Sequence, residues 1–149
     1  MIFWIGAGLF VTAGGIGGQW WYQRAKRRCR LLTALREILI RADDYIKNVG
    51  GEKAAFWETI EEKALFGEVS QVRRLELNEK AASLLSSAEL AAFAEIDNAF
   101  CAQCAESAER ILQKAIALFP QECSYLLKKA NAQRAVVFCA SVLLVLLLF

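Results

Sequence analysis

The first 22 residues constrain this chain most, because they contain no charged side chain and a dense basic run follows them. The stretch from Ile2 to Tyr22 would form about 30 Å of α-helix, which matches the hydrocarbon thickness of a bilayer. Phe3 and Trp4 lie near its start, and an aromatic triplet ends it. Aromatic side chains at both ends are typical of the two membrane interfaces. We therefore predict a transmembrane helix over residues 2–22.

The basic run after this helix predicts its orientation. It consists of Arg24, Lys26, Arg27, Arg28 and Arg30. Because positive residues mark the cytoplasmic side of a span, we expect the N-terminus outside and the following residues inside, with the five cations as candidate topology or lipid-contact residues. A cleaved signal peptide is the alternative, but it would carry its charge before the apolar run and a small-residue cleavage site after it. The sequence therefore favours an uncleaved anchor.

A second uncharged stretch ends the chain, from Ala135 to Phe149. It would form about 22 Å of helix, which is shorter than a usual span. The span would gain one more turn, back to Ala130, if Arg134 extends its charged group to the membrane interface. A buried core helix is the alternative, but this stretch is too apolar for one. We predict a second transmembrane helix over 135–149, which places both termini outside.

The residues between the two spans, 23–134, are predicted to form an all-α cytoplasmic domain. All eighteen Lys and Arg and all sixteen Asp and Glu lie in this part of the chain, which holds the one proline and few β-branched runs. We expect a helical bundle or hairpin flanked by the two transmembrane helices. Apart from the basic run this domain is slightly acidic, which argues against a nucleic-acid partner.

Apolar residues three and four positions apart predict the first helices of this domain. The first set is Leu31, Leu35, Ile38, Ala42, Tyr45 and Val49. This helix should continue from the membrane span without a break and stop at Gly50-Gly51, where helical preference is lost. A helix over 53–64 should bury Phe56, Trp57 and Ile60. A turn is expected over 65–70, and a helix over 72–85 has a weaker pattern.

One long helix is predicted before Pro120. Ser86 and Glu89 have the spacing of a capping box and would open it. Its inward face would consist of Phe93, Ile96, Phe100, Cys104, Ala108, Ile111, Ala115 and Leu118. Pro120 should end or kink this helix, because proline clashes with the preceding turn.

Few residues point to chemistry. The chain contains no histidine, which excludes His-dependent catalysis and His metal ligands. Cys101 and Cys104 have the spacing of a redox or zinc site, but no strand precedes them and further ligands are missing, so they are interpreted as small apolar residues, with Cys104 on the core face. We expect no catalytic, cofactor or metal site and no enzymatic activity. Asp43 and Asp44 are interpreted as solvated, with at most a role in partner contact.

Gly14 and Gly18 form a small-residue motif in the first span. Such a motif lets membrane helices approach closely, so the pair would pack the two spans together or join two copies of the chain in a homo-oligomer. Glycines without a specific partner are also common in membrane helices, and the sequence leaves this alternative open.

The whole layout resembles the stage III sporulation protein AB family of endospore-forming bacteria. The shared features are a glycine-containing first span, a basic edge, the leucines of Arg30-Leu31-Leu32-Thr33-Ala34-Leu35, a helical body, and a last span rich in Leu and Val from Val142 to Phe149. Members of that family resemble the helical domains of the type II secretion F protein. The resemblance implies a membrane platform in the channel apparatus between mother cell and forespore, in the mother-cell membrane. The implied partners are other channel components, above all the stage III sporulation protein AA ATPase.

Two other functions are consistent with the residues. The chain could be a membrane-anchored helical scaffold of another envelope or phage complex, because nothing in the anchors specifies the complex. A membrane-tethered thiol enzyme would depend wholly on Cys101 and Cys104.

Overall fold

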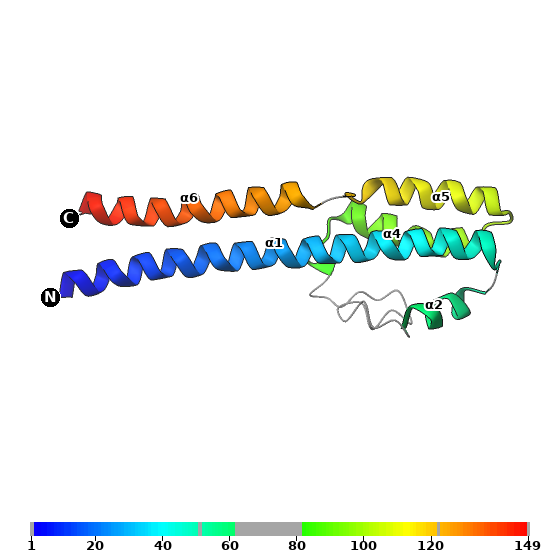
Figure 1. Ribbon diagram of the computed structural model, residues 1–149, viewed down its shortest axis with the longest axis horizontal. Coiled ribbons are helices and arrows are strands. Elements are labelled where there is room, and N and C mark those ends of the chain that lie inside the picture. The colour runs from blue at the N-terminus through cyan, green and yellow to red at the C-terminus, as the bar shows by residue number, and fades with distance from the viewer. Residues whose placement is uncertain (1, 51, 62–81, 122, 149) are drawn as a thin grey trace. The chain divides into compact units, whose positions relative to one another are not determined.

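The computed structural model describes residues 2–50, 52–61, 82–121 and 123–148, without the side chains of 2–5, 61 and 148. These residues form five α-helices and contain no strand, so the predicted all-α class is confirmed (Figure 1). The helices are α1 (Ile2–Asn48), α2 (Lys53–Glu61), α4 (Ser87–Phe100), α5 (Ala105–Leu118) and α6 (Ser124–Leu148). The predicted turn over 65–70 and most of the predicted helix over 72–85 lie outside the described residues.

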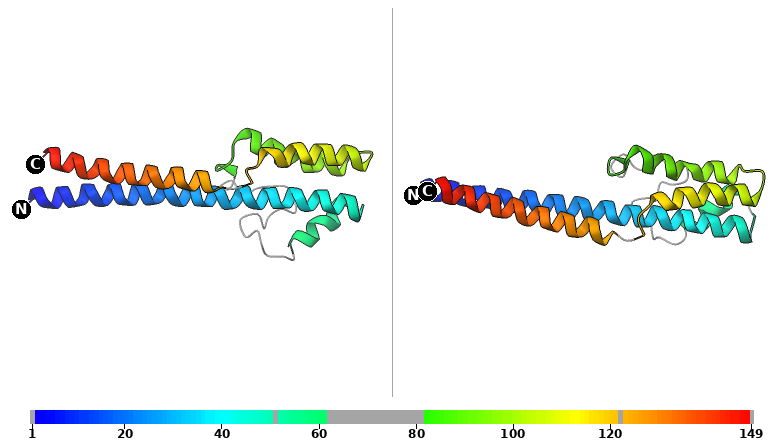
Figure 2. Two further views of the ribbon diagram at one scale, coloured as in Figure 1. Left: turned by 45° about the horizontal axis from the view of Figure 1, so that its top comes forward. Right: turned by 90° about the horizontal axis from the view of Figure 1, so that it is seen from above.

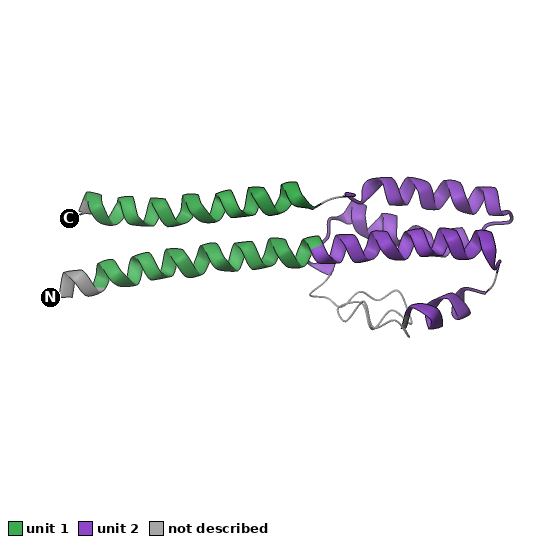
Figure 3. Ribbon diagram, viewed as in Figure 1, with its two compact units in different colours: residues 1–29, 122–149 green, residues 30–121 purple. Residues whose placement is uncertain are grey.

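The chain divides into two compact units (Figure 3). Unit 1 contains residues 1–29 and 122–149, and unit 2 contains residues 30–121. The boundaries predicted from the sequence were 22/23 and 134/135. The second boundary differs because residues 135–148 are the second part of the longer helix α6, which begins at Ser124.

Unit 1 consists of two antiparallel helices, the first part of α1 and the whole of α6. They lie side by side in all views, with both chain ends at the same end of the unit (Figures 1 and 2). Among the described residues, Ser124–Leu147 is the helix that is long and apolar enough to cross a membrane, and only 11% of its most apolar window is buried. The described part of α1 does not meet the same criterion. The predicted span 2–22 is helical, but the side chains of residues 2–5 lie outside the description.

The core of unit 2 is built around the second part of α1. Leu31, Leu35, Ile38 and Ala42 are all buried, which confirms the predicted inward face over these positions. The face is wider than predicted, because the adjacent residues Leu32, Leu39 and Asp43 are buried as well. An apolar stripe of this width is typical of a helix that packs against more than one neighbour. Val49 is exposed, since α1 has already ended at Asn48.

The end of α1 is determined by glycine, as predicted. Gly50 has a φ of 62°, a backbone conformation that residues with a Cβ atom rarely adopt. Its N–H donates to the carbonyl of Tyr45 at 3.2 Å. The predicted continuity of this helix is also confirmed, since α1 is a single helix from Ile2 to Asn48. The physical reason is that no helix breaker lies between Gly18 and Gly50.

An aromatic cluster joins three helices of unit 2. The ring of Phe56 on α2 lies 5.4 Å from that of Tyr45 on α1 and 5.2 Å from that of Phe100 on α4. Phe56 is almost completely buried, and Trp57 and Ile60 are buried beside it, as predicted. An ion pair between Lys53 of α2 and Asp97 of α4 lies outside this cluster. Aromatic rings at these distances contribute beyond the area they bury.

The predicted long helix before Pro120 is two helices that form an antiparallel hairpin, so this prediction is wrong (Figure 2). The capping box is confirmed: the N–H of Glu89 donates to Ser86 Oγ, and the N–H of Ser86 donates to the Glu89 carboxylate. The chain reverses over residues 101–104, and Cys104 is extended and exposed, not buried as predicted. Folding back lets each half bury its apolar face against the other. Small residues on both halves allow the close approach: Ala92, Ala99, Ala108 and Ala115.

The reversal also changes which residues of α5 face inward. Leu112 is buried in place of Ile111, and Leu118 is 58% exposed. Pro120 ends the helix, since α5 stops at Leu118 and the buried Phe119 caps it in an extended conformation.

Candidate functional site

Among the described glycines of unit 1, Gly14 lies closest to the opposing helix α6. A Cβ atom at this position would lie 2.8 Å from the Cβ of Ser141, and closer still to its Oγ. Ser141 is buried, and its hydroxyl donates to the carbonyl of Val137 at 2.8 Å, which satisfies the hydroxyl within α6. Only glycine fits at position 14 with the helices at this separation.

Gly18 lies on the same face of α1, one helical turn further along. A Cβ atom here would be 3.1 Å from Cγ of Arg134. By contrast, Gly15 and Gly17 have open space where a side chain would project. Both glycines of the predicted motif therefore face α6, the arrangement in which a small residue permits close helix packing.

Large apolar side chains are exposed on both helices of unit 1. They are Leu9, Phe10, Ile16, Trp20, Trp21, Val136, Val137, Phe138, Leu143, Leu144, Leu146 and Leu147. Single exposed apolar residues are ordinary, but this many on two adjacent helices indicate a membrane or protein partner.

Unit 1 also carries a concentration of positive charge, which we call the basic belt. It comprises four residues of α1 and three of α6: Arg24, Lys26, Arg27, Arg28, Lys128, Lys129 and Arg134. Glu122 is the one acidic residue in the sequence of this unit. Arg30, predicted with the same group, belongs to unit 2. Three members of the belt come from α6, the basic flank of the second predicted span, which the sequence places on the same side of the membrane as the basic run of α1.

Two arginines of the basic belt lie over aromatic rings. The guanidinium of Arg24 is 5.5 Å from the ring centre of Trp20, and that of Arg134 is 5.9 Å from the ring centre of Tyr22. Cation–π contacts of this kind are worth about 0.5–1 kcal/mol at exposed sites. The second contact joins α6 to α1.

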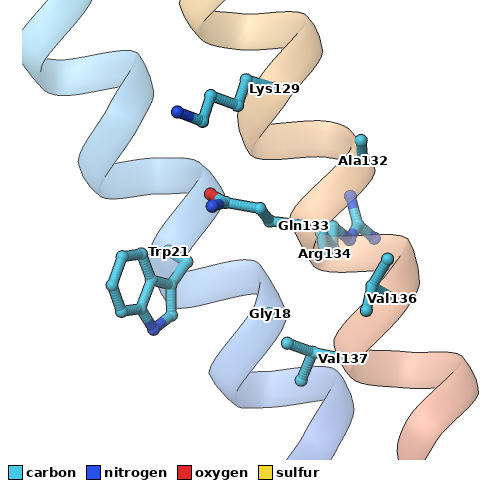
Figure 4. Close-up of a pocket in the computed structure, with 8 residues that line it drawn as sticks. All are labelled: Gly18, Trp21, Lys129, Ala132, Gln133, Arg134, Val136 and Val137. Carbon is cyan, nitrogen blue, oxygen red and sulfur yellow. The ribbon is translucent and has the colours of Figure 1, made fainter.

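A groove of about 450 Å³ opens between the two helices at the belt (Figure 4). It is lined by Gly18, Trp21, Lys129, Ala132, Gln133, Arg134, Val136 and Val137. Lys129, Gln133 and Val137 extend from α6 toward α1 in Figure 4. The groove therefore has cationic and amide groups at one end and aliphatic groups at the other.

Cys29 and Cys123 face each other at the end of unit 1. Each thiol lies near the other's carbonyl oxygen, with sulfur–oxygen distances of 3.4 Å from Cys29 and 3.6 Å from Cys123. Burial raises the pKa of the Cys29 thiol to about 12, and the hydrogen bond with Cys123 adds to the effect. Because the thiolate is the reactive form of cysteine, both burial and the raised pKa lower the reactivity of Cys29.

The other three cysteines are all exposed. Cys101 and Cys104 are both exposed at the turn between α4 and α5. Among the residues that the structure describes, no group of three or more cysteine and acidic side chains could hold a metal ion.

The acidic pair of α1 divides between core and surface. Asp43 is buried, contrary to its interpretation as a solvated residue, whereas Asp44 is exposed. Lys47 donates to Asp43 at 2.8 Å and pairs with Glu109 of α5 at 2.9 Å. These two hydrogen bonds raise the pKa of Lys47, that of Asp43 contributing most. Asp43 thus helps to join α1 to α5.

Comparison with known proteins adds no relative. No protein-family model, curated protein or solved structure matches the chain.

Proposed function

We propose that the protein is a two-pass membrane component whose helical unit 2 is a cytoplasmic docking platform. The observation that carries this proposal is the composition of unit 1, in which exposed apolar helices adjoin seven cations with one acid in its sequence. Apolar side chains of this number would be costly in water, and cations adjacent to a span favour the cytoplasmic side. Both chain ends would then lie on the exterior side of the membrane, and unit 2 on the cytoplasmic side.

The complex that we propose for this platform is the channel apparatus between mother cell and forespore, with a secretion-type ATPase as partner. The support is the resemblance of the whole layout to the stage III sporulation protein AB family. The charge of unit 2 is compatible with a partner that presents a basic face, because its sequence has eleven Lys and Arg against fifteen Asp and Glu. Electrostatic complementarity of this kind increases association rates and specificity.

Reporter fusions test the membrane arrangement. A periplasm- or exterior-active reporter and a cytoplasm-active reporter would be placed at each end and within the turn over residues 101–104. We expect exterior activity at both ends and cytoplasmic activity at the turn. A cytoplasmic C-terminus would refute the two-pass arrangement.

Co-purification tests the platform. The full chain, solubilised in mild detergent, should retain the secretion-type ATPase encoded in the same genome, and moderate salt should weaken the complex. If the topology holds but the ATPase is never retained, the chain is an anchored scaffold of another complex. If exchange of Cys101 and Cys104 for Ala abolishes function in a folded protein, the thiol-enzyme alternative is correct.

A further inference from the structure

We propose that the groove of unit 1 is a binding site for one anionic phospholipid, with the headgroup phosphate on Lys129 and Gln133 and an acyl chain along Val137 and Gly18. This inference rests on the proposed membrane location and deepens it. The basic belt would otherwise act only as diffuse charge, whereas the groove provides a defined position for a single lipid.

The order of residues along the groove follows that of a phospholipid. Lys129, Gln133 and Val137 are four residues apart, so they lie on one face of α6, and Figure 4 shows all three directed toward α1. Gly18 is buried and lines the groove together with Val137, and because it has no side chain it does not fill the groove at this point. The polar end of the groove therefore adjoins an aliphatic lining, along which an acyl chain would lie.

The electrostatics favour an anionic headgroup. Lys129 is exposed and forms no ion pair with any residue that the structure describes, so its ammonium can bind a phosphate. Arg134 also lines the groove, but its guanidinium lies over the ring of Tyr22. Among the described residues, no acidic side chain lines the groove, so none of them would bind the cationic group of a zwitterionic lipid there. Trp21, 58% exposed at the groove, has the amphipathic ring that is typical of the headgroup level.

The lining also distinguishes a lipid from a free phosphate compound. Gly18, Ala132, Val136 and Val137 offer aliphatic contact and no hydrogen-bond donor. A soluble anion would use only the cationic end, whereas a phospholipid fills the whole groove. Ligand sites of this volume usually have such a mostly apolar lining with a few polar groups that fix orientation.

The experiment compares two adjacent lysines in the full chain. Wild type, Lys129→Gln, Lys129→Arg and Lys128→Gln would be reconstituted in mixed phosphatidylglycerol and phosphatidylcholine bilayers, and retained lipids counted by native mass spectrometry. Lys128 is the matched control, because it is exposed, next in sequence and absent from the groove lining. Circular dichroism would verify that each variant keeps its helix content.

We expect wild type to retain one phosphatidylglycerol in preference to phosphatidylcholine. Lys129→Gln should reduce this preference about fivefold, because it removes a cation from the bound headgroup at a cost of about 1 kcal/mol. Lys129→Arg keeps the charge and Lys128→Gln lies outside the lining, so both should stay within twofold. Equal losses of preference in both glutamine variants, or no preference in wild type, would overturn the lipid site. Either result would leave the membrane proposal intact, because the protein would still be embedded in the bilayer. Failure of wild type to enter bilayers at all would overturn the membrane proposal itself.

Discussion

The contact of Gly14 with Ser141 makes the sharpest prediction for the stability of unit 1. In Gly14→Ala, the new Cβ would lie 2.8 Å from the Cβ of Ser141, and Oγ would be closer. The hydroxyl can rotate away, but the Cβ atom can move only with its helix. Reaching an ordinary contact of about 3.4 Å requires the helices to separate by roughly 0.6 Å, which forfeits a quarter or more of the neighbouring dispersion contacts.

Overpacking of this kind costs about 1–3 kcal/mol. Alanine also has a higher helix propensity than glycine, by about 0.5–1 kcal/mol, which would partly conceal the clash. Gly15→Ala is the matched control, because it gains the same propensity and has open space around its Cβ. The difference between the two variants isolates the clash, and it corresponds to about a 5- to 150-fold change in the unfolding equilibrium.

The assay is SDS-induced unfolding of the full chain in mixed micelles, followed by tryptophan fluorescence and circular dichroism. Ser141→Gly removes the opposing Cβ, so the double variant Gly14→Ala/Ser141→Gly should recover most of the loss, with a coupling energy of at least about 1 kcal/mol. If Gly14→Ala is as stable as Gly15→Ala, or if Ser141→Gly does not rescue it, the helix contact described here is incorrect.

Four further tests address other parts of the molecule. At pH 8, iodoacetamide should modify Cys29 at least about 100-fold more slowly than the exposed Cys101, because burial and a raised pKa both reduce the thiolate population of Cys29. The two rates would be measured by mass spectrometry, and equal rates would refute this prediction. Because the folded state keeps that proton, the stabilising contribution of Cys29 should be present below pH 9.0 and be lost as the pH rises toward 12. Ser86→Ala removes the capping box and should cost about 0.5–2 kcal/mol in thermal unfolding, and an unchanged midpoint would contradict the cap. Leu35→Ala should cost about 2–5 kcal/mol in denaturant unfolding, whereas Leu118→Ala at an exposed site should stay within about 0.5 kcal/mol; similar losses would refute the assigned core.

Local signals in the sequence predicted the helix ends well. Gly50 and the Ser86 capping box act within a few residues of the backbone groups that they satisfy, so their effect is visible in the sequence. The inward face of α1 was predicted for the same reason, because its apolar period is uninterrupted. Pro120 likewise ended a helix, although the sequence alone could not distinguish an end from a kink.

The hairpin of α4 and α5 was not predicted, because apolar spacing continues through its turn. Phe100, Cys104 and Ala108 have helical spacing, yet the chain reverses between them. No glycine or proline marks residues 101–104, and the energetic reason for the turn is the burial of each half against the other. Such tertiary packing overrides local preference and leaves no local signal.

Contacts between distant segments were equally hidden. The motif of Gly14 and Gly18 indicated a packing face but not its register against α6, so Ser141 and Arg134 could not be named as the opposing residues. The pairing of Cys29 with Cys123 depends on the same register. Asp43 was expected in solvent because its burial depends on a contact with a distant helix. Lys47 pairs with both Asp43 and Glu109, and Glu109 is more than sixty residues away from Asp43 in the chain.

The distribution of charge between the units bears on where a partner would bind. Unit 1 has seven basic residues and one acidic residue in its sequence, whereas unit 2 has an excess of four acids. At an anionic membrane surface each basic residue of unit 1 would gain about 1 kcal/mol, and the acids of unit 2 would be repelled within about one Debye length, roughly 10 Å. The lipid surface would therefore hold the basic belt and leave the acidic surface of unit 2 free. In the proposed membrane arrangement, an acidic platform beside an anionic membrane would select a basic partner, because that partner alone would be attracted by both surfaces at once.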